Sequence, residues 1–306
     1  MKTLLTGGLG YIGSHIAYYL KDKAVIIDNK TNSNLNYKKY IPHAKVYELD
    51  VNIKSLKKIF KTNAITSVIH LSSLKAVEES VYNPIKYYKN NVSSSMDLIE
   101  AIDEFNIKKL IFSSSATVYG NQQKVPFKEN YSLSSTNPYG NTKIIIEKLI
   151  DDYSKSNKSF KSISLRYFNP IGADLQSGLS DQPLGKPLNL IPILNYSVKN
   201  KKIFKIYGND YKTKDGTCLR DFIHVSDLAK AHIVALKKIN KIQGHEPINL
   251  GLGKCISVLD IIKLYEKINK VKVDYKFAKR RKGDLPISYA DNKKALNNIA
   301  NISFIF

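Results

Sequence analysis

The stretch "TGGLGYIGSH", residues 6–15, decides the fold of this chain. It follows the apolar run "KTLL" and places Gly7, Gly10 and Gly13 just before an amphipathic stretch, so we expect a buried strand, a tight turn and a helix over about Tyr11–Leu20. Glycine lets the backbone turn sharply and approach a ligand closely, and a helix N-terminus offers free N–H groups to an anion. The spacing predicts a site for the pyrophosphate of a dinucleotide.

An acidic residue stands where such a site needs one. Asp28 ends the apolar run "AVIID", which predicts the second strand. A carboxylate at that position accepts hydrogen bonds from the ribose hydroxyls of an adenosine and repels a 2′-phosphate. No arginine lies near Asp28 in the sequence. We therefore expect NAD rather than NADP.

Apolar and amphipathic stretches alternate through the first half of the chain. The expected strands are "KTLLTG", "AVIID", "SVIHL", "KLIFSSS" and "KSISLRYFN", and the expected later helices are "NPIKYYKNNVSSSMDLIEAIDEF", with Pro84 near its first turn, and "PYGNTKIIIEKLIDDYSK". Continuous apolar strands that alternate with helices are typical of a parallel sheet covered on both faces. The pattern predicts an α/β fold with a Rossmann-type doubly wound parallel sheet.

The pattern changes after Pro170. Residues 171–221 are rich in Gly, Pro, Asp and Asn, with few long periodic stretches, and helical periodicity returns near Val225 and at about Ser257–Ile268. We expect an NAD-binding domain of residues 1–170 with a returning segment of about 222–250. Residues 171–221 and 251–306 would form a smaller, interrupted α+β lobe that binds the substrate.

The numbers of lysines and arginines indicate whether the chain binds nucleic acid. The formal net charge is +22, but only four of the 48 basic residues are arginine, namely Arg166, Arg220, Arg280 and Arg281, and the lysines are spread along the chain. A nucleic-acid groove more often clusters its charge and uses arginine, so we expect no nucleic-acid partner. Where lysine is so common, each arginine is expected at a place that needs a planar, bidentate donor.

Other absences set the expected compartment. The chain has two cysteines without close spacing, runs from its first residues into the expected strand without a targeting peptide, and has no apolar run long enough to span a bilayer. We expect a cytoplasmic protein with no membrane partner. The six histidines show no metal-ligand spacing, so we expect no metal.

The stretch "TNPYGNTK", residues 136–143, holds Tyr139 and Lys143 one helical turn apart. In a chain with 20 tyrosines the spacing alone also fits a chance pair on a solvated helix. Its place after a strand that ends in Ser113–Ser115 favours chemistry, because ligands bind at the carboxyl ends of parallel strands. A lysine ammonium would favour the phenolate, and a serine hydroxyl could hold or relay the same proton.

Together these stretches resemble the extended short-chain dehydrogenase/reductase family. The resemblance runs from residue 3 to about 291 and also includes "VIHLSSLKAVEES", "YYKNNV", "LRYFNPIGA", "GNDYKTKDGTCLRDFIHVSDLA" and "GDLP". It is greatest to the members that invert C4 of a UDP-hexose. It implies NAD-dependent 4-epimerisation of UDP-glucose and UDP-galactose through a transient 4-keto sugar.

The resemblance also implies the roles of individual residues. Tyr139 would be the catalytic base and acid, Lys143 its partner and a ribose ligand, and Ser115 the hydroxyl relay. The cofactor site would comprise Gly7, Gly10, Tyr11, Ile12, Gly13, Asp28, Asn29, Asp50, Val51, Leu71, Lys75, Asn90, Tyr139, Lys143 and Phe168. The substrate site would comprise Ser115, Tyr139, Asn169, Asn189, Leu190, Tyr207, Arg220, Arg281, Asp284 and Ser288.

The sequence departs from the family pattern in places. Leu71, Ser72 and Ser73 follow His70, where an aromatic residue and small residues are usual, which implies a repacked cofactor pocket. Ser288 replaces a tyrosine that often limits room beside the sugar, which implies a wider pocket that also admits N-acetylated UDP-sugars.

Two alternative functions remain open at this stage, and so does the oligomeric state. A 4,6-dehydratase would need an acid–base pair where this chain has Ala116 and Thr117. A non-catalytic NAD-binding regulator would tend to lose Tyr139 and Lys143. The family usually forms homodimers through the helices near residues 83–104 and 139–154, but their apolar faces fit burial on the sheet equally well.

Overall fold

A seven-stranded sheet forms the centre of the computed structural model, which describes residues 1–122, 124–185, 187–281 and 283–299. The strand order is β11-β6-β5-β4-β1-β2-β3, and every neighbouring pair is parallel. The strands are β1 (Lys2–Thr6), β2 (Ala24–Ile27), β3 (Lys45–Tyr47), β4 (Ile65–His70), β5 (Lys109–Ser115), β6 (Lys161–Tyr167) and β11 (His245–Leu250). The predicted Rossmann-type sheet is confirmed.

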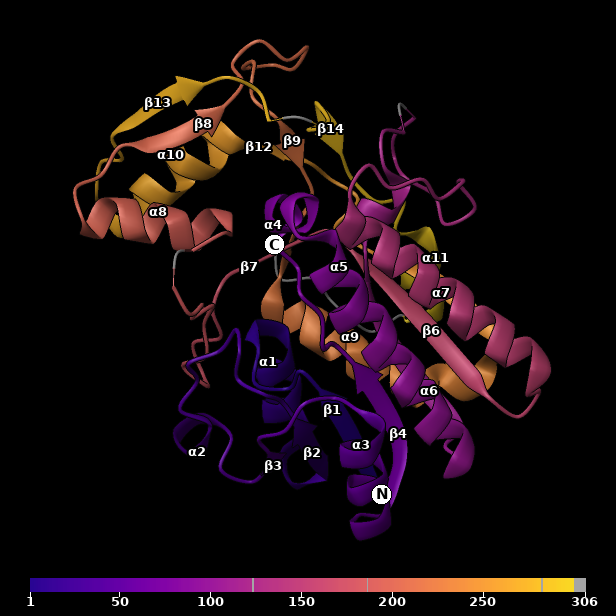
Figure 1. Cartoon of the computed structure of the whole chain (residues 1–306). Coiled ribbons are helices and arrows are strands. Elements are labelled where there is room, and N and C mark those ends of the chain that lie inside the picture. The colour runs from indigo at the N-terminus through magenta and orange to yellow at the C-terminus, as the bar shows by residue number, and fades with distance from the viewer. Residues whose placement is uncertain (123, 186, 282, 300–306) are drawn as a thin grey trace.

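Helices cover both faces of this sheet (Figure 1). One face packs on α1 (Tyr11–Leu20) and α9 (Val225–Lys238), and the other on α3 (Ile53–Thr62), α6 (Ser94–Glu104) and α7 (Pro138–Ser156). Successive strand residues point to opposite faces, so Leu5 joins the first core and Leu4 the second. Both side chains are fully buried, which explains why these strands read as continuous apolar runs.

A smaller lobe lies beside the carboxyl ends of the strands, at the upper left of Figure 1. It contains α8 (Leu190–Lys199), α10 (Val258–Asn269), the parallel pair β8 (Phe204–Tyr207) and β13 (Tyr275–Ala278), and a three-stranded sheet of β12 (Ile256–Ser257), β9 (Leu219–Arg220) and β14 (Ile287–Ser288). Leu194, Phe204 and Ile261 belong to its own core.

The remaining elements connect or extend these two parts. They are α2 (Tyr37–Tyr40), α4 (Val77–Tyr82), α5 (Pro84–Tyr87), a π-helix (Tyr88–Ser93), the paired strands β7 (Asn169–Ile171) and β10 (Phe222–His224), α11 (Lys293–Asn298), and 3₁₀ turns at Lys21–Lys23, Ala116–Tyr119 and Ile239–Lys241. α11 contacts β11 of the central sheet, although we predicted residues 251–306 to belong to the lobe. The division into two domains stays a prediction, and residues 300–306 lie outside the described residues.

The predicted helices are found, and the structure adds others that the sequence analysis did not predict, α3 and α8 among them. The predicted Tyr11–Leu20 helix has those bounds, and the helix predicted at Ser257–Ile268 spans Val258–Asn269. The helix α8 lies within 171–221, where the sequence showed few periodic stretches. Its Pro192 stands in the first turn, where the backbone N–H has no helical partner to lose, so this proline does not break the helix.

Among the described residues, no helix is both long and apolar enough to cross a membrane.

Candidate active site

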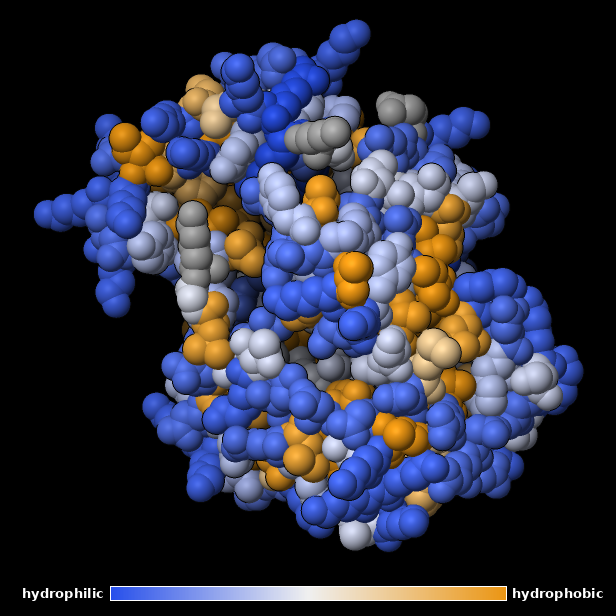
Figure 2. Space-filling view, viewed as in Figure 1, coloured by the Kyte–Doolittle hydropathy of each residue, from blue (hydrophilic) through white to orange (hydrophobic). Residues whose placement is uncertain are grey.

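A cavity of about 780 Å³ opens where the strand order reverses, outside the carboxyl ends of β1 and β4. Its walls come from the turn after β1, the end of β5, the start of α7 and the smaller lobe. Figure 2 shows the hollow between the lobe and the main body. A parallel sheet binds its ligand at this position, because the loops on either side of the reversal diverge.

The structure brings most of the predicted site residues together at this cavity. Its lining includes Gly7, Gly10, Tyr11, Ile12, Gly13, Asp28, Asn29, Asp50, Val51, Leu71, Lys75, Asn90, Ser115, Tyr139, Lys143, Phe168, Asn169, Asn189, Arg220, Asp284 and Ser288. Three predicted substrate residues, Leu190, Tyr207 and Arg281, are not part of the lining. The individual roles of all these residues stay predictions.

The glycine turn at the start of α1 leaves no room for side chains. Gly7 has φ of +70°, and a Cβ there would lie 2.8 Å from the Ser72 backbone. A Cβ at Gly13 would lie 2.5 Å from the Gly7 carbonyl oxygen. Gly10 is the N-cap of α1. The first turn has no capping side chain and no acidic residue to pair with its backbone N–H groups. The open N–H groups fit a phosphate anion, so this turn fits the pyrophosphate of NAD.

Asp28 lies at the edge of the same turn. Its carboxylate accepts hydrogen bonds from the backbone N–H of Leu9 (3.0 Å) and of Lys30 (2.7 Å). Burial raises the pKa of Asp28, while the two N–H donors oppose that rise. Beside it, Asn29 donates to the Asp50 carboxylate at 2.7 Å. These acceptors lie at the cavity wall and fit the hydroxyls of a nucleoside ribose.

Local sequence fixes where α7 begins and therefore where Tyr139 lies. The Asn137 side chain caps the helix by accepting from Gly140 N–H at 2.9 Å, and Pro138 occupies the first turn. Tyr139 and Lys143 follow on one face, and both are buried, at 9% and 3% exposure. The Lys143 Nζ donates to the Ser113 carbonyl oxygen at 2.9 Å, which anchors α7 to β5.

Burial moves both side chains away from their ordinary ionisation. It raises the pKa of Tyr139 to about 12, and hydrogen bonding with Ser115 opposes that rise. It lowers the pKa of Lys143 to about 7, and the Glu147 carboxylate opposes that fall. The Lys143 ammonium lies 4.8 Å from the Phe112 ring centroid and 5.8 Å from that of Tyr139. A lysine that can shed its charge and a phenol beside it form a pair suited to proton transfer.

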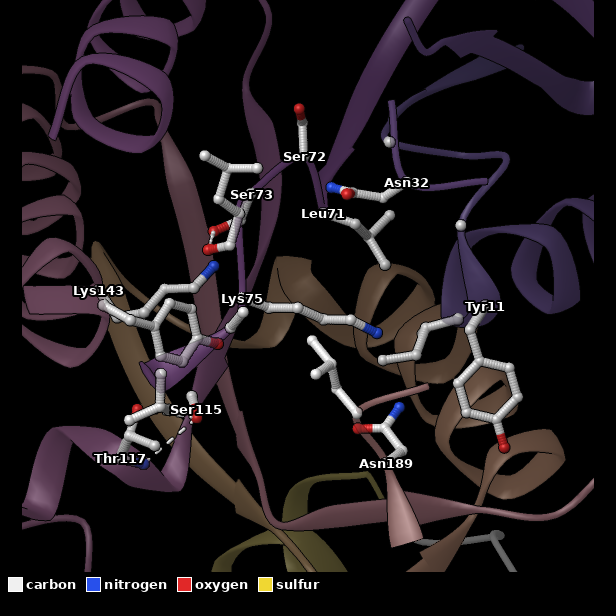
Figure 3. Close-up of a pocket in the computed structure, with 18 of the residues that line it drawn as sticks. Tyr11, Asn32, Leu71, Ser72, Ser73, Lys75, Ser115, Thr117, Lys143 and Asn189 are labelled. Carbon is white, nitrogen blue, oxygen red and sulfur yellow. Dashed lines mark hydrogen bonds between the residues drawn. The ribbon is translucent and has the colours of Figure 1, made fainter. Parts of the chain in front are cut away.

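The serine at the end of β5 completes this set. Ser115 accepts hydrogen bonds from the Thr117 backbone N–H (3.2 Å) and from the Thr117 hydroxyl (3.0 Å). Figure 3 shows Ser115 and Lys143 on one side of the cavity and Tyr11 on the other, with Lys75 extending between them. The predicted proton-handling residues and the predicted cofactor residues thus face one space.

Polar residues of the smaller lobe line the other end. Arg220 donates to the Asp284 carboxylate at 3.4 Å, and Asn189 donates to the Asp181 carboxylate at 2.6 Å. The Arg281 guanidinium instead stacks over the Tyr207 ring, 4.0 Å from its centroid. This end offers a cation and several hydrogen-bonding groups to a polar ligand.

Sequence reasoning missed two buried carboxylates next to the cavity. Asp221 accepts from the backbone N–H groups of Leu252, Gly253 and Ala290, and burial raises its pKa to about 6. Glu147 binds Arg166 through two nitrogens of the guanidinium, which confirms for Arg166 the expected need for a planar donor. The position of Glu147, four residues after Lys143, is the signal that could have revealed it.

The family of the chain follows from comparison with known proteins. Residues 3–251 match the model of the NAD dependent epimerase/dehydratase family. The chain belongs to this family. A UDP-glucose 4-epimerase of Dictyostelium discoideum is 43% identical to this chain, over 97% of this chain and 90% of the relative. The resemblance noted in the sequence is confirmed.

Solved structures of this family have the same fold. The UDP-glucose 4-epimerase of Bifidobacterium longum, in complex with NAD+ and UDP, superposes with a TM-score of 0.92 at 38% identity, covering 99% of this chain and 96% of that one. The enzyme of Stenotrophomonas maltophila, with bound NAD and formylated UDP-arabinopyranose, gives a TM-score of 0.93 at 36% identity, covering 98% and 92%. NAD is the cofactor of the family, as predicted, and the glycine turn fits it.

The lowered pKa of Lys143 predicts a pH effect on the stability of the ligand-free protein. Lys143 titrates at about 7 when folded, and near 10.4 when unfolded. The unfolded chain binds more protons between these values, so Lys143 makes the free energy of unfolding rise with pH in that window. The rise is about 2 kcal/mol from pH 7 to 9.

Urea unfolding of the wild type and of Lys143→Met at both pH values measures this effect. The variant should lack the rise that Lys143 causes. The matched control is Lys148→Met, on the exposed face of the same helix. Equal pH dependence in the wild type and Lys143→Met would show that Lys143 ionises normally.

Proposed function

We propose that this chain catalyses the NAD-dependent 4-epimerisation of a UDP-hexose, interconverting UDP-glucose and UDP-galactose through a transient 4-keto sugar. The observation that carries the proposal is that Tyr139, Lys143 and Ser115 share one cavity with the glycine turn. Two relatives of similar length to this chain are UDP-glucose 4-epimerases, and they are 43% and 42% identical to it. The reaction returns the cofactor to its starting state, so the enzyme is an isomerase.

The proposed cofactor site would hold NAD with groups from the turn between β1 and α1 and from the end of β2. The turn of Gly7, Gly10 and Gly13 would hold the pyrophosphate against the α1 N-terminus, and Asp28 would hold the adenosine ribose. Bound NAD supplies the hydride acceptor and donor for C4 of the sugar and, when oxidised, a positive charge beside Tyr139. The walls formed by Leu71 and Phe168 would exclude water from the reacting carbon.

The chain itself moves the proton. The Tyr139 oxygen would take the proton of the sugar 4-OH as C4 is oxidised, and would return it to the same oxygen after the sugar has presented its other face. The Lys143 ammonium would stabilise the phenolate, since opposite charges nearby favour the ionised form. Ser115 would hold the 4-oxygen in line with Tyr139. Burial of both ionisable groups strengthens these interactions.

The smaller lobe would hold the nucleotide while the sugar turns. Arg220 would bind the diphosphate, and Asp284 would accept a hydrogen bond from a ribose hydroxyl. The Arg220 guanidinium lies 3.4 Å from the Asp284 carboxylate, so one ligand can contact both. The resemblance also places Tyr207 on the uracil, although its ring lies outside the cavity lining and the Arg281 guanidinium stacks on it. Binding through the remote nucleotide leaves the hexose free to rotate about its link to the diphosphate, which inversion at C4 requires.

A 4,6-dehydratase needs a different set of side chains. Elimination of water requires an acid and a base just after the serine, and the cavity has Ala116 and Thr117 there. Neither side chain can transfer a proton at neutral pH. A non-catalytic role as an NAD-binding regulator would not need a buried Tyr139 and Lys143. Epimerisation is the reaction that this cavity supports best.

Replacing the phenol tests the proposed function. In a coupled assay that converts UDP-galactose to UDP-glucose, the wild type should turn over, and Tyr139→Phe should lower kcat by at least about 100-fold because the general base is lost. NAD bound per chain should stay the same. Tyr275→Phe, at an exposed tyrosine on β13, is the control and should keep wild-type kcat. Inactive wild type, or an active Tyr139→Phe, would contradict the proposal.

The small residue at position 288 supports a wider sugar range. Ser288 is half-buried at the cavity wall. We expect turnover of UDP-N-acetylglucosamine, and Ser288→Tyr should lower it at least about tenfold relative to UDP-galactose, since the larger ring fills the space beside the sugar. Steady-state kinetics with both substrates measure this. Absence of UDP-N-acetylglucosamine turnover by an enzyme active on UDP-galactose would refute the wider range.

Exposed apolar side chains support a homodimer. Ile85, Met96 and Ile145, on α5, α6 and α7, are 71%, 55% and 41% exposed, and Figure 2 shows apolar side chains over these helices. Burying such a patch against a second copy would stabilise a dimer. Sedimentation should give a dimer, and Ile85→Asp combined with Met96→Asp should shift it toward monomer. A wild-type monomer would contradict this assembly.

A cytoplasmic location remains part of the proposal. Its support is that both cysteines, Cys218 and Cys255, are free thiols, as a reducing compartment keeps them.

A further inference from the structure

Three ionisable residues follow one another at single-turn spacing on α7. Tyr139 and Lys143 line the cavity, whereas Glu147, one turn further along, does not. The Glu147 side chain is 6% exposed and lies between α7 and the sheet. Its carboxylate is therefore out of reach of any ligand in the cavity but directly behind the lysine that the proposed chemistry uses.

A buried arginine holds this carboxylate. Arg166 Nε donates to both Glu147 oxygens, at 3.0 and 3.2 Å, and a terminal nitrogen donates to Oε2 at 2.5 Å. The arginine side chain is 4% exposed. Removing two charges from water costs so much that a buried pair stabilises a fold little over apolar residues of the same size. Stability alone therefore accounts poorly for this pair.

The strand β5 connects the pair to the proton-handling residues. Ser114 donates to Glu147 Oε1 at 2.5 Å, while the carbonyl of the preceding Ser113 accepts from Lys143 Nζ at 2.9 Å. Ser115, the next residue, lines the cavity. Ser114 is also the register partner of Arg166 in β6. Two successive turns of α7 are thus hydrogen-bonded to two successive residues of one strand.

The far side of the arginine is equally fixed. Its NH1 donates to the Tyr119 hydroxyl and to the Glu129 carbonyl oxygen, both at 3.1 Å. The Tyr119 hydroxyl in turn donates to the Asn249 side chain at 2.6 Å. The guanidinium cannot shift without breaking contacts to several segments, so the Glu147 carboxylate has one position.

The charge of Glu147 also acts on Lys143. It raises the pKa of Lys143, against the burial that lowers it. Other ionisable groups near the two residues include Tyr139 and Asp151 on α7, Arg166 and Tyr167 on β6, His70 on β4 and His245 on β11. Burial lowers the pKa of both histidines, to about 3 and about 4, so they are neutral at physiological pH.

We propose that Glu147, held by Arg166 and Ser114, is a positioning residue for the acid–base chemistry. It fixes the second turn of α7 on β5, so that Lys143 stays beside Tyr139, and its negative charge favours the ammonium form of that lysine during turnover. The kinetic part of this inference rests on the proposed function; the ionisation of Lys143 does not.

Two variants of the full-length holoenzyme test the proposal. Glu147→Gln keeps the shape and removes the charge, but leaves the Arg166 charge buried without a partner. The double variant Glu147→Met with Arg166→Met removes both charges with similar volumes, a change that buried ion pairs commonly tolerate. The matched control is Asp152→Asn, which removes an exposed ion pair of the same helix.

The expected result is a change in the pH profile. In the double variant kcat should fall at least about tenfold at pH 8, with KM changed by less than about twofold, because only the chemical step needs the ammonium. The pH at which kcat falls on the alkaline side of its pH profile should be lower by about one unit in the double variant. Glu147→Gln should shift it the same way, and Asp152→Asn should not. A folded double variant with wild-type kcat and alkaline limb overturns the proposal.

A second readout separates this inference from the proposed function. NMR of the lysine side chains of the holoenzyme, with the Lys143 signal assigned through Lys143→Met, gives the pKa of Lys143 directly. That pKa should be lower in the double variant than in the wild type. The comparison holds even if the wild type fails to epimerise UDP-galactose, and an unchanged Lys143 pKa would overturn the proposed electrostatic role.

Discussion

The rest of the site depends on one hydrogen bond, from the buried Lys143 ammonium to the Ser113 carbonyl at 2.9 Å. A lysine amine with 3% exposure cannot be hydrated, so neighbouring protein groups must provide the hydrogen bonds and charge interactions that water would have provided. The strand carbonyl, the face of the Phe112 ring and the Glu147 charge do so. Because Lys143 binds β5 at the residue before Ser114, the helix and the strand have one relative setting. Tyr139, one turn earlier, then lies above Ser115.

The central sheet and the smaller lobe contribute different groups to the cavity. The central sheet holds the groups that need accurate placement: the glycine turn, Asp28, Ser115 and the start of α7. The smaller lobe rests on short strands and loops, and its polar residues reach the cavity from outside. The buried Asp221 connects the parts, because its backbone pairs with Asn169 and Ser288 while its carboxylate accepts three backbone N–H groups. The proposed acid–base residues and the proposed nucleotide-binding residues therefore come from different elements.

The sequence predicted features that depend on local spacing. The bounds of α1, the acceptor Asp28 after β2, and Tyr139 with Lys143 at the start of α7 follow from short patterns of glycine, apolar and capping residues. It did not predict contacts that depend on strand register. Arg166 meets Glu147 and Ser114 only because β6 pairs with β5 at that residue, and nothing in the sequence between Glu147 and Arg166 indicates this contact. The helix α8 was missed because residues 171–221 show few long periodic stretches, and Tyr207 and Arg281 contact each other outside the cavity lining.

The central claim is that bound NAD and the Lys143 ammonium make a buried phenol acidic enough to take a proton from an alcohol. Burial raises the pKa of Tyr139 to about 12 in the free protein, even though hydrogen bonding with Ser115 opposes the rise. The most direct measurement is the ultraviolet titration of phenolate in the wild type minus that in Tyr139→Phe, with and without NAD. The account predicts a single extra tyrosine that titrates well below its ordinary value of about 10 when NAD is bound. A phenol that still titrates near 12 with NAD bound, in an enzyme that turns over, would contradict it.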